Sequence, residues 1–355
     1  MRPRVLLLSL ALGALGAGRV PARADGFDWR LKAQLAFEVD TNAERKEGRA
    51  PGAVDGDTRL LLRGSLAWRF AERHALSLRV DLGGKVFFQA RDEDLFISSA
   101  TLGYDFRAHD RVSFEVDATI KDRHERVDET AYLNAAGGGA VRFVLASKLD
   151  LRLRAGYARF LFRADDASFG YRGDDYALTL VAYPARRVRL SASYGFARRA
   201  YDAKVFLPDP VSPGIVKLGQ DTRGDDVHSA ELRARVLRVV LVDASYTFQA
   251  VRSNSYGFSY LRHRVGLQLS AKLPWGVFGH LGGALQWLSF RDPVFLDPVL
   301  FVEDDNRNFV SVKLTRALAP KLSLEARWSF YASGFSGDPL YYRRHVAGLG
   351  VAYAF

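Results

Sequence analysis

The stretch FDWRLKAQLAFEVD, residues 27–40, alternates between apolar and polar side chains along almost its whole length. One parity carries Phe27, Trp29, Leu31, Ala33, Leu35, Phe37 and Val39, and the other carries Asp28, Arg30, Lys32, Gln34, Glu38 and Asp40. On an α-helix these charges would spread over every face, whereas a strand with a period of two separates them from the apolar residues. The segment is therefore predicted to be a β-strand with one apolar and one charged face.

The start of the chain has the pattern of an export signal. Arg2 and Arg4 precede an apolar run from Val5 to about Ala17, and the triplet Ala22-Arg23-Ala24 follows. This order predicts a secretory signal peptide over residues 1–24, cleaved before Asp25. A membrane anchor is the weaker alternative, because the run is shorter than the ~20 residues that span a bilayer. The remaining residues, 25–355, are predicted to form a single domain, with no Cys for disulfides.

The same alternation recurs to the end of the chain. With turn residues as boundaries, it predicts an all-β fold of about sixteen strands. Their approximate ranges are 27–40, 58–70, 75–89, 95–107, 112–122, 131–146, 150–162, 174–184, 188–200, 227–237, 239–251, 258–272, 277–290, 308–316, 321–332 and 342–355. These strands exceed the 5 or 6 residues typical of soluble proteins and match the 9 to 11 tilted residues that cross a membrane.

The links between the strands alternate in length. Short links such as residues 71–74, 108–110 and 184–187 alternate with longer ones near 41–57, 163–173, 201–226 and 291–307. In these features the chain resembles the porin-type outer-membrane β-barrels of Gram-negative bacteria, which have short periplasmic turns and longer extracellular loops. The resemblance implies a transmembrane antiparallel up-and-down barrel in the outer membrane. The last strand ends in Phe355, which resembles the terminal aromatic recognised by the barrel-assembly machinery.

Aromatic residues of the apolar parity gather near the strand ends. Aliphatic residues lie between them, so two girdles at headgroup depth are predicted to bracket a lipid-facing band. The expected periplasmic girdle contains Phe27, Trp29, Trp68, Phe70, Tyr104, Phe106, Tyr353 and Phe355, and the expected extracellular girdle contains Tyr194, Phe196, Tyr246, Phe248, Trp287, Trp328 and Phe330.

The polar parity is predicted to line an aqueous lumen, since a barrel of sixteen strands is too wide for side chains to fill. Basic residues outnumber acidic ones on it, and the predicted pore-lining set is Arg30, Arg59, Arg63, Arg79, Arg142, Arg152, Arg154, Arg189, Arg233, Arg262, Arg264 and Arg327. Ladders of arginine favour anions in a pore. The alternative is that these arginines pair with acids on neighbouring strands, and the sequence does not decide between the two.

Two of the long links carry apolar residues between prolines. The residues are Phe206 and Leu207 in the first link and Phe295, Leu296 and Phe301 in the second. Apolar clusters of this kind normally pack on something or bind something. We expect these loops to pack on each other as a cap or to fold into the lumen; a docking surface and strands rising above the membrane are the alternatives.

The sequence contains no recognisable catalytic constellation. His228 and Ser229 are adjacent and would point to opposite faces of a strand, and the other histidines lack metal-ligand spacing. No enzyme activity, cofactor or metal site is therefore predicted. The basic charge is spread along strand faces, which argues against a nucleic-acid partner.

The leading hypothesis is an outer-membrane pore for hydrophilic, preferentially anionic, solutes. One alternative is an export barrel that passes a surface polysaccharide with envelope partners. A second is a non-conducting barrel that anchors surface machinery. The expected partners are outer-membrane lipid, lipopolysaccharide and the barrel-assembly machinery, which would act on Phe355. The solute and the oligomeric state are not specified by the sequence.

Overall fold

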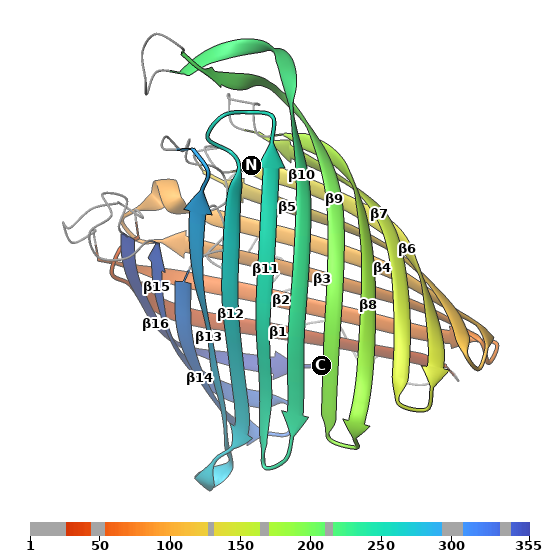
Figure 1. Cartoon of the computed structure of the whole chain (residues 1–355). Coiled ribbons are helices and arrows are strands. Elements are labelled where there is room, and N and C mark those ends of the chain that lie inside the picture. The colour runs from red at the N-terminus through yellow and green to blue at the C-terminus, as the bar shows by residue number, and fades with distance from the viewer. Residues whose placement is uncertain are drawn as a thin grey trace.

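The computed structural model describes residues 26–43, 54–126, 131–163, 170–209, 216–292, 308–333 and 342–355. They form one closed antiparallel barrel in which each strand pairs with its neighbour in the chain and the last strand pairs with the first (Figure 1). The predicted signal peptide, residues 1–24, lies outside the described residues.

The sixteen strands run from twelve to 22 residues in length. In chain order they are β1 (Phe27–Asp40), β2 (Asp55–Phe70), β3 (His74–Phe87), β4 (Leu95–His109), β5 (Val112–Glu125), β6 (Tyr132–Ala146), β7 (Leu149–Phe162), β8 (Tyr171–Ala185), β9 (Val188–Pro208), β10 (Val216–Leu237), β11 (Val240–Ser253), β12 (Tyr260–Lys272), β13 (Val277–Phe290), β14 (Asn308–Ala319), β15 (Leu322–Ser333) and β16 (Tyr342–Ala354). The predicted barrel of about sixteen strands is confirmed, and the bounds of β1 and β13 are those predicted.

One predicted link is wrong over most of its length. Residues 201–226 were expected to be a loop, but β9 continues to Pro208 and β10 begins at Val216. The two strands form a hairpin that rises beyond the rest of the barrel (Figure 1, green). Pairing continues from Leu218↔Phe206 to Val216↔Pro208, above register shifts between Leu218 and Gly224. The prolines and charges of this segment are typical of a loop. Proline and charged residues are nevertheless accepted in paired strands where the pairing is irregular.

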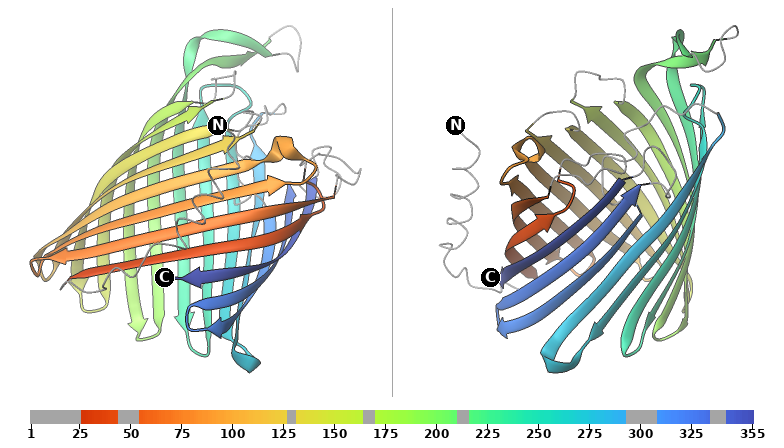
Figure 2. Two further views of the ribbon diagram at one scale, coloured as in Figure 1. Left: turned by 180° about the vertical axis from the view of Figure 1, so that it is seen from behind. Right: turned by 90° about the vertical axis from the view of Figure 1, so that its left-hand side faces the viewer.

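The two faces of the wall differ as the alternation predicts. On β1, Leu35 and Phe37 are each 51% exposed on the outer face, whereas their neighbours Glu38 and Asp40 are buried on the inner face. The two rims differ as well, because the links at one end are short and those at the other are mostly longer (Figure 2). Two of the links contain a short 3-10 turn, η1 (Arg91–Glu93) and η4 (Pro274–Gly276). Among the described residues, no helix has the length and hydropathy needed to span a bilayer.

The barrel closes where β16 meets β1, and the two backbones approach closely there. Nine residue pairs run from Lys32↔Ala354 to Asp40↔Val346. The register places Gly350 opposite Ala36, and a Cβ at Gly350 would lie 2.5 Å from the Leu35 carbonyl oxygen and 2.6 Å from the Ala36 Cβ. A side chain at this position would therefore force the first and last strands apart.

We predict that Gly350→Ala destabilises the barrel by about 1–3 kcal/mol, the usual cost of overpacking. The measurement is the urea concentration at which half of the refolded protein in detergent is unfolded. The folded fraction is read on gels from the difference in mobility between folded and boiled samples. Gly64→Ala is the matched control, because the nearest atoms to a Cβ at Gly64 are 3.9 Å away. A wild-type midpoint for Gly350→Ala would contradict the tight approach at the seam.

Candidate functional site

The candidate site is a recess of about 290 Å³ on the inner wall, where β13–β16 meet β1 and β2. Its lining comes from alternate positions of six consecutive strands, and it combines charged side chains with the bare backbone of Gly348 and Gly350. The basic residues that line it are Lys32, Arg59, Arg63, Lys313 and Arg327, and the acidic ones are Glu38 and Glu325. His280 and Ser311 complete the polar part of the lining. The recess therefore has more positive than negative charge.

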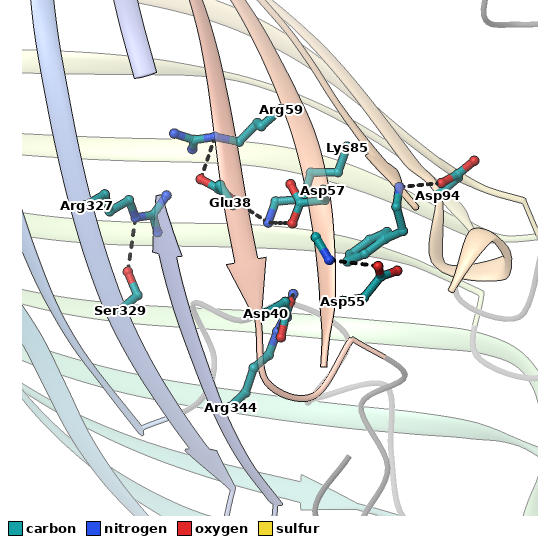
Figure 3. A network of polar contacts seen from close by, with 12 residues as sticks. Glu38, Asp40, Asp55, Asp57, Arg59, Lys85, Asp94, Arg327, Ser329 and Arg344 are labelled. Carbon is teal, nitrogen blue, oxygen red and sulfur yellow. Dashed lines mark hydrogen bonds and ion pairs between the residues drawn. The ribbon is translucent and has the colours of Figure 1, made fainter. Parts of the chain in front are cut away.

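A buried network of ion pairs borders the recess (Figure 3). Glu38 is only 1% exposed and forms ion pairs with Lys85 at 2.6 Å and with the Arg59 Nε at 3.0 Å. Lys85 also lies 3.5 Å from Asp57, which is fully buried. Buried carboxylates are tolerated only when they are paired. This network fixes Arg59 and Lys85 against the wall and leaves them little freedom to follow a passing solute.

The link between β3 and β4 is anchored to the same network (Figure 3). Asp55 accepts backbone hydrogen bonds from Gly56 at 2.7 Å, Gln89 at 2.9 Å and Ala90 at 2.8 Å. Asp94 accepts one from the Phe87 backbone at 2.8 Å. Asp55 thus satisfies two backbone N–H groups of this link, and Asp94 satisfies the last one of β3.

A second buried pair lies across the seam. Arg344 on β16 donates through Nε to Asp40 on β1 at 2.7 Å, and these side chains are 2% and 0% exposed. The link after β1 is tied to the same strand, because the Asn42 amide donates to the Arg343 carbonyl at 3.1 Å. The first and last strands are thus joined by charge as well as by backbone hydrogen bonds.

The twelve predicted pore-lining arginines all occupy the inward parity of their strands. Seven of them pair with carboxylates. The pairs are Arg30–Asp28, Arg59–Glu38, Arg63–Asp81, Arg142–Asp150, Arg152–Glu115, Arg154–Asp117 and Arg233–Asp243. Most of these pairs link neighbouring or nearby strands, so for these seven residues the charge-pairing alternative holds.

The other five predicted arginines form no ion pair within the described part of the chain. They are Arg79, Arg189, Arg262, Arg264 and Arg327. Arg327 has only neutral acceptors, the Ser329 hydroxyl at 3.0 Å and the Tyr331 hydroxyl at 2.9 Å. Lys32 and Lys313, each 2.8 Å from Glu325, share that single carboxylate. Of these five arginines Arg327 alone lines the recess, where its charge adds to those of Lys32 and Lys313.

Sequence reasoning missed several members of this site. Glu38, Asp57, Lys85 and Arg344 were not among the predicted residues, although each has the inward parity of its strand. The alternation could have identified them one by one. It could not indicate that the network forms where the first and last strands meet, since that requires knowledge of barrel closure.

The predicted girdle residues at the short-turn rim contact one another. The rings of Trp68 and Phe70 are 4.6 Å apart, and those of Tyr353 and Phe355 are 4.8 Å apart and edge-on. Trp29 neighbours this set, because it pairs with Leu66 on β2. Phe70, Tyr104 and Phe106 lie around the ring of His74. The Phe355 backbone N–H donates to the Leu31 carbonyl at 2.9 Å, and its recognition by the assembly machinery stays a prediction.

The girdle residues nearer the other rim also surround histidines. The contacts involve Tyr194 and Phe196 with His228, Tyr246, Phe248 and Trp287 with His263, and Trp328 and Phe330 with His345. Sequence analysis treated these histidines as scattered. The signal that could have found them is an aromatic-x-Phe tripeptide on the strand that pairs with each one: YGF (194–196), YTF (246–248) and WSF (328–330), with YDF (104–106) beside His74 at the other rim.

The structure describes only the first of the two segments of the predicted loop cap, and there it fits the alternative of strands that rise above the membrane. Phe206 and Leu207 lie on the strand ladder of the raised hairpin, opposite Leu218 and Lys217. Phe206 stacks against Phe258 at 6.1 Å, and its backbone N–H donates to the Ser255 hydroxyl at 2.8 Å. The hairpin thus contacts the link after β11. Phe295, Leu296 and Phe301 lie outside the described residues.

Within the part of the chain that the structure describes, no group of three or more His, Cys, Asp or Glu side chains is placed to hold a metal ion. The recess offers guanidinium and ammonium groups, and these suit the binding of oxyanions.

The comparisons with solved structures support the fold. OprB of Pseudomonas putida has a TM-score of 0.51 at 11% identity, with 93% of this chain and 94% of that chain covered. OmpF of Salmonella typhi, solved with daunomycin, has a TM-score of 0.51 at 10% identity, with 93% of this chain and 98% of that chain covered. The match to a bacterial polysaccharide outer membrane secretin covers 92% of this chain and 97% of that chain at 10% identity. Its TM-score of 0.44 is too low to inform function.

No protein-family model matches the sequence, and no curated protein sequence matches it. The structural likenesses establish that the chain has the fold of bacterial outer-membrane β-barrel proteins. At 10–11% identity they establish the fold alone.

We predict that Arg344→Met destabilises the barrel by about 3–5 kcal/mol, because it leaves the Asp40 carboxylate buried without an opposite charge. The double variant Asp40→Asn, Arg344→Met removes both charges and should recover most of that loss. The measurement is again the urea midpoint in detergent. If the single and double variants unfold at the same midpoint, the seam pair is not what holds Asp40 in the interior.

Proposed function

We propose that this protein is a channel of the Gram-negative outer membrane that passes small hydrophilic solutes and favours anions. The observation that carries the proposal is the uncompensated positive charge in the recess on the inner wall. Arg327 is held by two neutral hydroxyls, and Lys32 and Lys313 share one carboxylate. Together with Glu325 these residues carry a net charge of +2.

Two features of the barrel support a channel. The outer face carries large exposed hydrophobic side chains such as Leu232, Leu285 and Leu349, as contact with hydrocarbon requires. The inner face carries the ion pairs, and charged side chains of this kind are stable only where water or a partner solvates them. Sixteen strands enclose an interior wide enough for an aqueous path.

The positions of the ion pairs favour an anion path beside β13–β16. On the wall formed by β5–β8, each of Arg142, Arg152 and Arg154 is matched by a carboxylate, so that wall has little net charge. An anion that enters the lumen therefore gains more from the side that holds Arg327 than from the β5–β8 wall. Polymer export and the anchoring of surface machinery stay predictions, because no specific contact favours either.

We predict that the protein forms channels in planar bilayers with an anion-shifted reversal potential in a KCl gradient. Arg327→Gln should lower the anion-to-cation permeability ratio by roughly two- to threefold, since one charge about 7 Å from an ion in water is worth about 0.6 kcal/mol. The gradient should stay near 0.1 M, because higher salt screens the charge.

The matched control is Arg316→Gln, which removes the same charge from the outer parity of β14, opposite Leu324. Its permeability ratio should equal that of the wild type. A cation-selective wild-type channel would contradict the proposed anion preference. Folded protein that inserts and does not conduct would contradict the channel itself.

A further inference from the structure

Three histidines on the outer face share one arrangement. His74, His228 and His263 each place Nδ1 against the hydroxyl of a tyrosine on a neighbouring strand, Tyr104 at 2.7 Å, Tyr194 at 2.8 Å and Tyr246 at 2.8 Å. A phenylalanine two residues after each tyrosine, Phe106, Phe196 or Phe248, covers the imidazole at 4.8–5.1 Å between ring centres. These three histidine–tyrosine pairs recur on different strands. They face away from the lumen, so a role in solute passage does not account for them.

The depth of these pairs is regular. His228 and His263 each lie nine residues before the last residue of their strand, Leu237 and Lys272 (237 − 228 and 272 − 263). Nine residues of a strand tilted by about 40° rise roughly 23 Å, close to the ~25 Å height of the apolar band in such barrels. His74 is the first residue of β3, at the opposite rim. The pairs therefore lie at the two borders between hydrocarbon and headgroups.

The hydrogen bond to tyrosine determines what the other ring nitrogen presents. Either partner can donate in these contacts, and we assign the donor role to the phenol O–H because it is the stronger acid. The neutral ring then carries its hydrogen on Nε2, where the protonated ring also carries one. Within the described residues, Nε2 of none of the three histidines has a hydrogen-bond partner. With this assignment each pair presents one N–H donor at headgroup depth, between neighbouring aromatic rings.

The surroundings of His263 are especially simple. Its strand neighbours are Phe248 on β11 and Trp287 on β13, the latter stacked at 5.5 Å with an interplanar angle of 9°. Leu261 and Val265 flank it on the same face of β12. No carboxylate faces this ring among its described neighbours, so its donor has no internal acceptor. Beside His228, in contrast, Asp226 is engaged by Arg198 at 3.2 Å.

We propose that the histidine–tyrosine pairs bind the phosphate groups of membrane-lipid headgroups through Nε2–H. The lipid is the ligand because the pairs lie on the hydrocarbon-facing parity, where a dissolved anion would have to leave water. The donor would form a charge-assisted hydrogen bond with the phosphate oxygen, while the aromatic rings pack against the upper acyl chain. The inference rests on the proposed insertion into a membrane, and it does not depend on conduction.

The test is ¹⁵N{³¹P} dipolar dephasing by solid-state NMR on protein labelled with ¹⁵N-histidine in phosphatidylglycerol bilayers. The buffer contains no phosphate, so the lipid is the only source of ³¹P. We expect dephasing of the ring-nitrogen signal, and the part due to His263 should disappear in His263→Gln. His280→Gln is the control, since His280 lies on the inner wall and bonds to the Ser270 hydroxyl at 2.8 Å; it should leave the dephasing unchanged.

A second variant tests the role of tyrosine. Tyr246→Phe keeps the ring stack and removes the hydroxyl, so the His263 tautomer is no longer fixed and its dephasing should weaken. Absence of dephasing in protein that is folded and inserted would overturn the inference, as would dephasing lost in His280→Gln and kept in His263→Gln. Conductance of the same preparation reports on the proposed function separately, and a conducting protein without dephasing would refute only the lipid contact.

Discussion

The structure depends on one constraint, that every backbone N–H and C=O group of the wall must find a partner within the wall. Hydrocarbon offers no hydrogen bonds, so a sheet with a free edge cannot be stable there. The pairing of β1 with β16 removes both edges at once. Gly350 permits the close approach, and the buried Arg344–Asp40 pair adds a charge contact at one end of the same seam. Closure and the candidate site are thus built from the same strands.

The arrangement of charge follows from closure. Once the apolar parity faces outward, each charged residue of the other parity must be solvated inside the barrel. Over β5–β8 the chain does this by pairing arginine with aspartate or glutamate on strands nearby, as with Arg154 and Asp117. Beside the seam the pairing is incomplete, and Arg327 is held by hydroxyl groups. The functional proposal rests on this difference between two parts of one wall.

Much of the fold could be predicted from the sequence because a period of two is a local signal. It located sixteen strands and assigned the inward and outward residues, as for Arg262 on β12 and Tyr246 on β11. The pairing of charges could not be predicted, because it depends on the register between strands. The alternation fits equally well when a strand shifts by two residues. Strands that rise above the membrane were only an alternative prediction for the raised hairpin, because Pro208 and the charged residues near it resemble a loop. The histidine–tyrosine pairs were missed because each pair is split between two strands.

The central claim, that the two faces of each strand lie in different solvents, can be tested by cysteine accessibility along β12. The natural chain contains no Cys, so single cysteines at residues 267, 268, 269 and 270 report without background. The measurement is labelling by a charged, membrane-impermeant maleimide in proteoliposomes. The account predicts that the Gln268→Cys and Ser270→Cys proteins react from water, whereas the Leu267→Cys and Leu269→Cys proteins stay protected. Equal labelling at all four positions, or the opposite alternation, would contradict it.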